Sequence, residues 1–284
     1  MLDIIVFNVE HGQSIFVYPQ GAPEYGMLID CGNTSDFNPI DLVIQWKLLP
    51  IDPTGRYVLR NLALTNYDHD HFSGLPYLRS RVHIATTFLA PNVSASELLA
   101  IKPEKTEALE HLCYLKNTYT GTVQNYAPPY RIVPFSLTKN QFLGEQWDTN
   151  NLSQVIFVQY GGSTICVCGD LEKAGWERML QNVNFRSWLQ STDILVAAHH
   201  GRENGHAEEI FGFCKPECVI LSDKAIVHGT QEGMAQAYAS RTRGDGVTLV
   251  SAPTVQRRKV LTTRNDGHIW VQLAPGNGRI YRTL

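Results

Sequence analysis

Short apolar runs recur along the chain and predict β-strands. The runs are rich in Ile, Val and Phe, and turn residues such as Gly, Pro, Asn and Asp separate them. Apolar residues at helical spacing predict helices between some of the strands. The predicted strands are 2–9, 14–18, 26–30, 58–65, 155–159, 164–168, 193–197, 218–221, 248–251, 260–263 and 268–273, and the predicted helices are 39–49, 94–117, 173–189 and 208–213.

The order of these elements bears on the fold class. Strands come first, followed by a helix, more strands, several helices and a last set of strands. This order predicts an α/β (α+β) fold in which two sheets pack together and are flanked by helices. The sequence contains no short-period repeat, low-complexity tract or Gly/Ser linker, so a single domain over residues 1–284 is the simpler interpretation. Residues 118–150 are rich in Thr, Asn, Pro and Tyr and are predicted to form an irregular insertion.

Composition and charge exclude some classes of protein. Of the 284 residues, 43% are hydrophobic and 18% are charged, which is the usual balance for a globular protein. The net charge of -3 gives no overall basic field for nucleic acid, although a local basic patch is compatible with it. We expect no signal peptide, because the first residues lack a positive segment followed by an apolar one, and no apolar run approaches about 20 residues. The six cysteines lack the spacing of a secreted disulfide scaffold. We therefore expect a cytoplasmic protein that does not enter the membrane.

Four ionisable residues stand consecutively at the end of one predicted strand. Asp68, His69, Asp70 and His71 follow the run 58–65 and precede a Gly-containing turn. Burial of such charges without partners costs several kcal/mol. A shared divalent cation would make the cluster tolerable, because carboxylate and imidazole groups both bind such metals. From this segment alone, a solvated turn is nearly as good an interpretation.

Two further predicted strands also end in ionisable residues. Asp170 follows the run 164–168, although an Asp before a predicted helix is more often an N-cap. His199 and His200 follow the run 193–197, where they could instead be satisfied core histidines. Three apolar strands that each end in Asp or His are less easily explained by chance than one such strand. Together they therefore predict a metal site. Its predicted centre is formed by Asp68, Asp70, His71, Asp170 and His199.

The order of these motifs resembles the metallo-β-lactamase superfamily, and within it the branch of the DNA-uptake competence protein ComEC. The similar segments are FNVEHGQS at 7–14, LIDCG at 28–32, TNYDHDHFSG at 65–74, NNLS at 150–153, CGDLE at 168–172, HHG at 199–201, HG at 228–229 and DGHI at 266–269. The resemblance spans nearly the whole chain, and the metal motifs are its specific part. It implies a four-layer αββα sandwich, with metals at one edge that activate water toward an ester or phosphodiester bond. In the competence branch the substrate is DNA.

The resemblance also implies two sets of metal ligands. The first site would contain Asp68, Asp170 and neutral amides such as Asn66, which occupies the position of the superfamily's first histidine. Oxygen ligands of this kind suit Mn²⁺ or Mg²⁺ better than Zn²⁺. The second site would contain Asp70, His71, Asp170 and His199, a set that suits Zn²⁺ or Mn²⁺.

These ligands lead to a hypothesis about catalysis and to three about function. Asp70 would accept the proton of a metal-activated water, and His200 or His228 would protonate the leaving oxygen. His11 either lines the pocket or is a satisfied strand histidine. The leading interpretation is a phosphodiesterase or nuclease with a nucleic-acid or nucleotide substrate. The alternatives are a catalytically weakened regulatory or binding subunit that works with a protein partner, and a hydrolase of a lactone, thioester or cyclic nucleotide.

Overall fold

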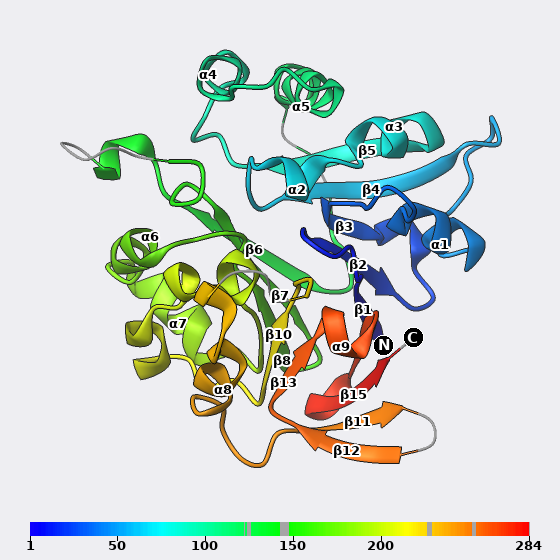
Figure 1. The fold of residues 1–284 in the computed structure, drawn as a ribbon. Coiled ribbons are helices and arrows are strands. Elements are labelled where there is room, and N and C mark those ends of the chain that lie inside the picture. The colour runs from blue at the N-terminus through cyan, green and yellow to red at the C-terminus, as the bar shows by residue number, and fades with distance from the viewer. Residues whose placement is uncertain (122, 124–125, 143–147, 226–228, 252–253, 284) are drawn as a thin grey trace.

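The computed structural model describes residues 1–283 except 122, 124–125, 143–147, 226–228 and 252–253 (Figure 1). Its larger sheet has the strand order β12-β11-β15-β14-β1-β2-β3-β4-β5. Neighbouring strands are antiparallel except in the pairs β3–β4, β4–β5 and β11–β15. The strands of this sheet are β1 (Leu2–Val6), β2 (Ser14–Pro19), β3 (Met27–Cys31), β4 (Tyr57–Leu64), β5 (Val82–Leu89), β11 (Val247–Ser251), β12 (Thr254–Arg258), β14 (Ile269–Ala274) and β15 (Gly278–Thr283).

The smaller sheet has the strand order β13-β10-β9-β8-β7-β6. Strands β6, β7 and β8 are antiparallel, whereas β8, β9, β10 and β13 run parallel to one another. The strands of this sheet are β6 (Arg131–Ser136), β7 (Gln154–Tyr160), β8 (Ser163–Val167), β9 (Ile194–Val196), β10 (Cys218–Leu221) and β13 (Val260–Thr262). Both sheets are therefore mixed, as expected for an α/β (α+β) fold.

Alternating side chains of the strands form the core between the sheets. In β1, Ile4 and Val6 belong to one buried cluster, whereas Ile5 belongs to another. In β7, Ile156 and Val158 join the cluster that contains Ile4 and Val6. Because successive side chains of a strand point to opposite faces, this division places one cluster between the sheets and the other beneath the helices.

Helices cover the outer faces of both sheets. Figure 1 shows α3 and α5 beside the larger sheet and α6, α7 and α8 beside the smaller one. The described helices are α1 (Pro39–Gln45), α2 (His69–Phe72), α3 (Leu75–Arg81), α4 (Ala95–Ile101), α5 (Glu107–Thr118), α6 (Lys173–Met179), α7 (Val183–Gln190), α8 (Met234–Ala239) and α9 (Thr263–Asp266). The predicted arrangement of two sheets between helices is thereby confirmed. Within the described ranges, no helix is long and apolar enough to cross a membrane.

The structure differs from the sequence-based prediction at several elements, and three of these differences have a clear physical reason. The helix predicted over 94–117 is divided into α4 and α5, because Pro103 disfavours a helical conformation at Lys102 and Thr106 caps α5 anew. The helix predicted over 173–189 is likewise divided at Asn182, whose side chain caps α7. The range 118–150 contains β6, an edge strand that tolerates Pro134 because one side of an edge strand needs no ladder hydrogen bond. The single domain over 1–284 stays a prediction.

Candidate metal centre

Side chains from three strand ends meet at one place between the sheets. Asp70 and His71 lie in α2, which follows β4 of the larger sheet. Asp170 follows β8 and His200 follows β9, two parallel neighbours of the smaller sheet whose ends meet at the same edge. One ligand atom from each of these four residues lies within 4.8 Å of all the others.

The four side chains form a compact, largely buried cluster. His71 Nε2 lies 3.0 Å from Asp170 Oδ1, and His200 Nε2 lies 3.0 Å from Asp70 Oδ2 and 3.5 Å from Asp170 Oδ1. The side chains of His71, Asp170 and His200 are almost wholly buried, whereas that of Asp70 is 20% exposed. Asp70 is therefore the residue through which solvent reaches the cluster.

Each imidazole is oriented by a hydrogen bond at its other nitrogen. His200 Nδ1 lies 2.9 Å from the carbonyl oxygen of Ser222, which can only accept, so this nitrogen carries the proton. His71 Nδ1 lies 2.8 Å from Asp30 Oδ2. Asp30 is fully buried and also accepts hydrogen bonds from the backbone N–H of Thr65 at 2.7 Å and from Gln13 Nε2 at 2.8 Å. Both rings consequently direct Nε2 into the cluster, as metal-binding histidines do.

Backbone conformation decides which histidine enters the cluster. His199 and His200 have φ values of 50° and 55°, in the left-handed region that residues other than glycine rarely adopt. The backbone N–H of His199 donates to the carbonyl oxygen of Gly169 at 2.9 Å, which anchors this turn beside Asp170. The turn directs His200 into the cluster, while His199 Nδ1 lies 3.3 Å from Glu172 Oε1.

The glycine-containing loops pack closely against the backbone of Asp70. A Cβ atom at Gly32 would overlap the carbonyl oxygen of Asp70, and one at Gly12 would lie 2.6 Å from the same atom. The backbone N–H of Gln13 donates to this oxygen at 3.3 Å. The segments 7–14 and 28–32 therefore support the position of Asp70 through their backbones.

Opposite charges within the cluster stabilise the ionised forms of its histidines and of Asp70. Burial disfavours the imidazolium form of His71, but the negative charges of Asp170 and Asp30 outweigh burial and raise its pKa well above the usual value. Burial likewise opposes the charge on His200, yet Asp170 and Asp70 raise its pKa. Burial also disfavours ionised Asp70, but its contact with His200 and the nearby imidazolium charges hold its pKa below the usual value.

The donor atoms fit a metal ion better than they fit one another. His71 Nε2, His200 Nε2 and Asp170 Oδ1 are buried, and none of them has a hydrogen-bond partner within the described part of the chain. Their separations of 3.0–3.5 Å bring opposite charges together within the cluster. Buried polar atoms without a partner are rare in proteins and call for an explanation such as an ion. Two imidazole nitrogens and two carboxylates that converge on one point are suitable ligands for a divalent metal.

The other predicted ligands lie outside this cluster. Asp68 forms an ion pair with Lys102 and accepts a hydrogen bond from Thr149 Oγ1 at 2.8 Å. Asn66 Oδ1 accepts from the backbone N–H of Tyr67 and, at 3.1 Å, from that of Asp68. Of the residues predicted to transfer protons, Asp70 and His200 lie in the cluster, and His228 lies outside the described residues.

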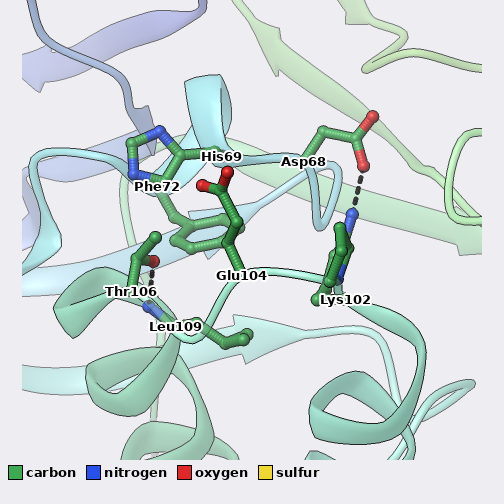
Figure 2. Close-up of a pocket in the computed structure, with 8 residues that line it drawn as sticks. Asp68, His69, Phe72, Lys102, Glu104, Thr106 and Leu109 are labelled. Atoms are coloured by element: carbon green, nitrogen blue, oxygen red, sulfur yellow. Dashed lines mark hydrogen bonds and ion pairs between the residues drawn. The ribbon is translucent and has the colours of Figure 1, made fainter.

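A cavity of about 460 Å³ adjoins Asp68 and His69. Its lining includes Asp68, His69, Phe72, Lys102, Pro103, Glu104, Thr106 and Leu109. Figure 2 shows the ammonium group of Lys102 directed at the carboxylate of Asp68 across this space. The cavity thus adjoins α2, the helix that carries Asp70 and His71.

Sequence reasoning did not identify three contributions to this centre. Asp30 was noted only as part of a motif, although it orients His71. His200 was assigned to proton transfer and His199 to the metal, because adjacent histidines at a strand end cannot be distinguished without the turn geometry. The pairing of Lys102 with Asp68 could not be predicted, because the two residues lie 34 positions apart in the sequence.

Solved structures resemble the chain at low sequence identity. The metallo-β-lactamase fold protein YhfI from Bacillus subtilis is 12% identical, with coverage of 99% of this chain and 100% of its own and a TM-score of 0.48. A diphosphatase of the PhnP family is 11% identical, with coverage of 93% of this chain and 85% of its own and a TM-score of 0.45.

Two curated proteins are related to the chain by sequence, whereas no protein-family model matches it. ComE operon protein 3 of Bacillus subtilis (strain 168) is 25% identical over an alignment that covers 78% of this chain and 28% of that protein. Competence protein ComA of Neisseria gonorrhoeae is 24% identical, with 84% of this chain and 29% of that protein covered. The chain thus spans less than a third of the length of either relative. With its two mixed sheets between helices, the chain has a metallo-β-lactamase fold, and it is distantly related to these competence proteins.

Proposed function

We propose that the chain is a metal-dependent hydrolase that cleaves phosphodiester bonds in a nucleic acid or nucleotide. The observation that carries the metal requirement is the convergence of three buried ligand atoms that have no hydrogen-bond partner among the described residues. The phosphodiester specificity is supported by the distant relationship to competence proteins and by the charges near the centre.

The ligand set favours Zn²⁺ or Mn²⁺ over Mg²⁺ or Ca²⁺. His71 and His200 contribute imidazole nitrogens, which the two hard cations rarely select. Asp70 and Asp170 contribute carboxylate oxygens, which both Zn²⁺ and Mn²⁺ accept. Such a cation supplies Lewis acidity, which lowers the pKa of a water molecule and polarises a phosphoryl oxygen.

His11 is the protein group best placed to handle a proton at the exposed side of the centre. Its Nε2 lies 3.5 Å from Asp70 Oδ2, and 36% of its side chain is exposed. Burial is the main cause that lowers the pKa of His11 to about 4, with contributions from His200, Arg202 and Lys224. His11 is therefore neutral at pH 7 and can accept a proton from water beside Asp70.

Two basic residues near His11 support an anionic substrate. The charges of Arg202 and Lys224 both contribute to the lowered pKa of His11, so both residues lie near it. Neither side chain forms an ion pair with another described residue, and Arg202 Nε is buried without a hydrogen-bond partner there. In this part of the surface a phosphate group would find unneutralised positive charge, despite the net charge of -3 of the whole chain.

One observation favours a second candidate function. Asp68 and Asn66, which the sequence assigns to a metal site, are both engaged with other protein groups. This arrangement suits a regulatory or binding subunit that retains the fold and one ion but has little activity, and that acts with a protein partner.

Metal content tests the proposal first. Protein purified without chelator is analysed by elemental mass spectrometry beside the variant Asp70→Ala/His71→Ala. The control is Asp36→Ala/His83→Ala, which removes the same residue types from exposed positions. We expect bound Zn or Mn in the wild type and control and none in the first variant.

The loaded protein is then assayed with bis(p-nitrophenyl) phosphate, DNA, RNA and cyclic nucleotides. Absence of metal after incubation with Mn²⁺ and Zn²⁺ would refute the hydrolase function, and metal without cleavage would favour the binding subunit.

A further inference from the structure

A second metal ion would need ligands from the turn that precedes the cluster. The resemblance implies a first site built from Asn66, Asp68 and Asp170 beside the site that contains Asp70. Among the described residues, only Asp70, His71, Asp170 and His200 form a group whose ligand atoms converge. Asn66 and Asp68, which the resemblance assigns to the first site, contact other protein groups instead. These contacts determine whether a second ion can bind.

Asn66 is fully engaged in hydrogen bonds with the protein. Its Oδ1 accepts from the backbone N–H groups of Tyr67 and Asp68, and its Nδ2 donates to Asn150 Oδ1 at 2.9 Å. The side chain is buried, with 1% exposure. Turning the amide oxygen toward an ion would leave buried backbone donors unsatisfied, at a cost of roughly 1–3 kcal/mol for each group.

Asp68 already has a cation beside it. The ammonium group of Lys102 contacts Asp68 Oδ1, and Thr149 Oγ1 donates to the same oxygen at 2.8 Å (Figure 2). The side chain of Lys102 is 20% exposed and that of Asp68 is 35% exposed, so water screens this pair in part. An ammonium group in direct contact with the carboxylate of Asp68 neutralises its charge and repels a divalent ion that approaches it.

His199 contributes no ligand atom to the cluster, and its Nδ1, which has no hydrogen-bond partner among the described residues, lies beside a carboxylate. Its Nδ1 faces Glu172 Oε1 at 3.3 Å, and Glu172 Oε1 in turn accepts from Asn204 Nδ2 at 2.7 Å and from Asn150 Nδ2 at 3.3 Å. Asn150 is the residue that also contacts Asn66. Hydrogen bonds therefore connect Asn66 through Asn150 to Glu172, the carboxylate beside His199.

We propose that Lys102 takes the place of a second metal ion, so that the centre binds a single divalent cation. The ammonium group supplies the positive charge that compensates Asp68, and the cation bound by Asp70, His71, Asp170 and His200 acts alone. This inference rests on the proposed metal-dependent function, but it concerns the number of ions and not the reaction that they support.

The test is the stoichiometry and spectrum of bound Mn²⁺. Chelator-treated protein is titrated with Mn²⁺ alone, and the bound ion is examined by electron paramagnetic resonance, in which two bridged Mn²⁺ ions give an exchange-coupled signal. We expect one ion with an uncoupled spectrum in the wild type. We expect two coupled ions in Asn66→His/Lys102→Met, which removes the ammonium and supplies an imidazole at position 66. In Lys102→Met, which keeps a similar length but leaves the amide of Asn66 in its hydrogen bonds, we expect the second ion to bind more weakly.

Two controls assign a gained ion to this place. Lys105→Met removes an exposed lysine whose ammonium contacts only backbone carbonyl oxygens, and it should still bind one ion. Asp68→Asn/Lys102→Met should again bind one ion, because Lys102→Met frees the carboxylate of Asp68 and Asp68→Asn removes it. Two ions in the wild type would overturn the inference, as would an unchanged count in both Lys102→Met and Asn66→His/Lys102→Met. No ion in the wild type would refute the proposed function together with the inference that rests on it, whereas two ions in the wild type would overturn the inference alone.

Discussion

At the scale of single residues, the centre depends on hydrogen bonds made away from the ligand atoms. Asp30 and the carbonyl oxygen of Ser222 hold the Nδ1 atoms of His71 and His200, which leaves each Nε2 directed at the same space. Residues in such supporting positions change metal affinity without contact to the ion.

Replacement of Asp30 should therefore weaken metal binding. The carboxylate oxygens of Asp30 face three buried groups, on Gln13, Thr65 and His71. In Asp30→Asn, an NH₂ group replaces one of these two oxygens. We expect Mn²⁺ or Zn²⁺ affinity to fall about 10–100-fold, measured by competition with a chromophoric chelator. Asp3→Asn is the matched control, because Asp3 is also buried and accepts hydrogen bonds from two glutamine side chains. Equal affinities of the two variants would contradict the role of Asp30.

The pH dependence of metal affinity follows from the raised pKa values of His71 and His200. Without metal, both rings hold a second proton to a higher pH than a free histidine, and an ion must displace it. Affinity should therefore rise by about tenfold per pH unit for each displaced proton until the raised pKa is passed. The same shifts stabilise the metal-free fold below the ordinary histidine pKa, and this contribution is lost as pH rises through the raised values. Calorimetry in buffers of different ionisation enthalpy counts the protons, and a pH-independent affinity would refute the linkage.

At the scale of elements, short turns after the strands select the ligands. The turn in η3 (Ala198–Gly201) places two consecutive histidines in the left-handed conformation, and the hydrogen bond from His199 to Gly169 joins it to the end of β8. The two neighbours in sequence consequently face different surroundings.

This geometry predicts opposite results for two identical substitutions. His199→Asn should retain metal, whereas His200→Asn should lose it, because only His200 contributes a ligand atom to the cluster. Asn tolerates the left-handed conformation, so neither change should disrupt the turn. Elemental mass spectrometry measures the outcome, with circular dichroism to confirm folding. Loss of metal in His199→Asn alone would show that the ligand predicted from the sequence is the correct one.

At the scale of the whole molecule, the centre joins the two sheets. Asp70 and His71 come from the larger sheet, and Asp170 and His200 come from the smaller sheet, so their separation depends on the core between the sheets. Ile156 belongs to this core and is fully buried.

Truncation of this core should therefore cost stability. Ile156→Ala should lower the free energy of unfolding by about 2–5 kcal/mol, since it removes buried methyl groups and leaves a cavity. Ile51→Ala makes the same chemical change at a residue that is 58% exposed, and we expect its effect to remain within about 0.5 kcal/mol. Urea unfolding measures both, and similar values would contradict the assignment of Ile156 to the core.

Much of the architecture was predictable because apolar runs are a local property of the sequence. The runs at 2–9, 155–159 and 164–168 predicted strands that the structure contains as β1, β7 and β8. Strand β6 was missed because its polar and proline-containing surroundings resemble those of a loop, and only its pairing with β7 makes it a strand.

For the candidate site, the sequence by itself determined where ionisable residues follow buried strands, because strand ends can be recognised from hydropathy alone. It therefore located Asp70, His71 and Asp170, which the structure brings together. Only the tertiary structure decided between His199 and His200, and only it paired Asp68 with Lys102. The physical reason is that both outcomes depend on contacts formed only in the folded chain. The left-handed turn at His199 and His200 is held by contacts with Gly169 and Ser222, and Asp68 meets Lys102 from 34 positions away in the sequence.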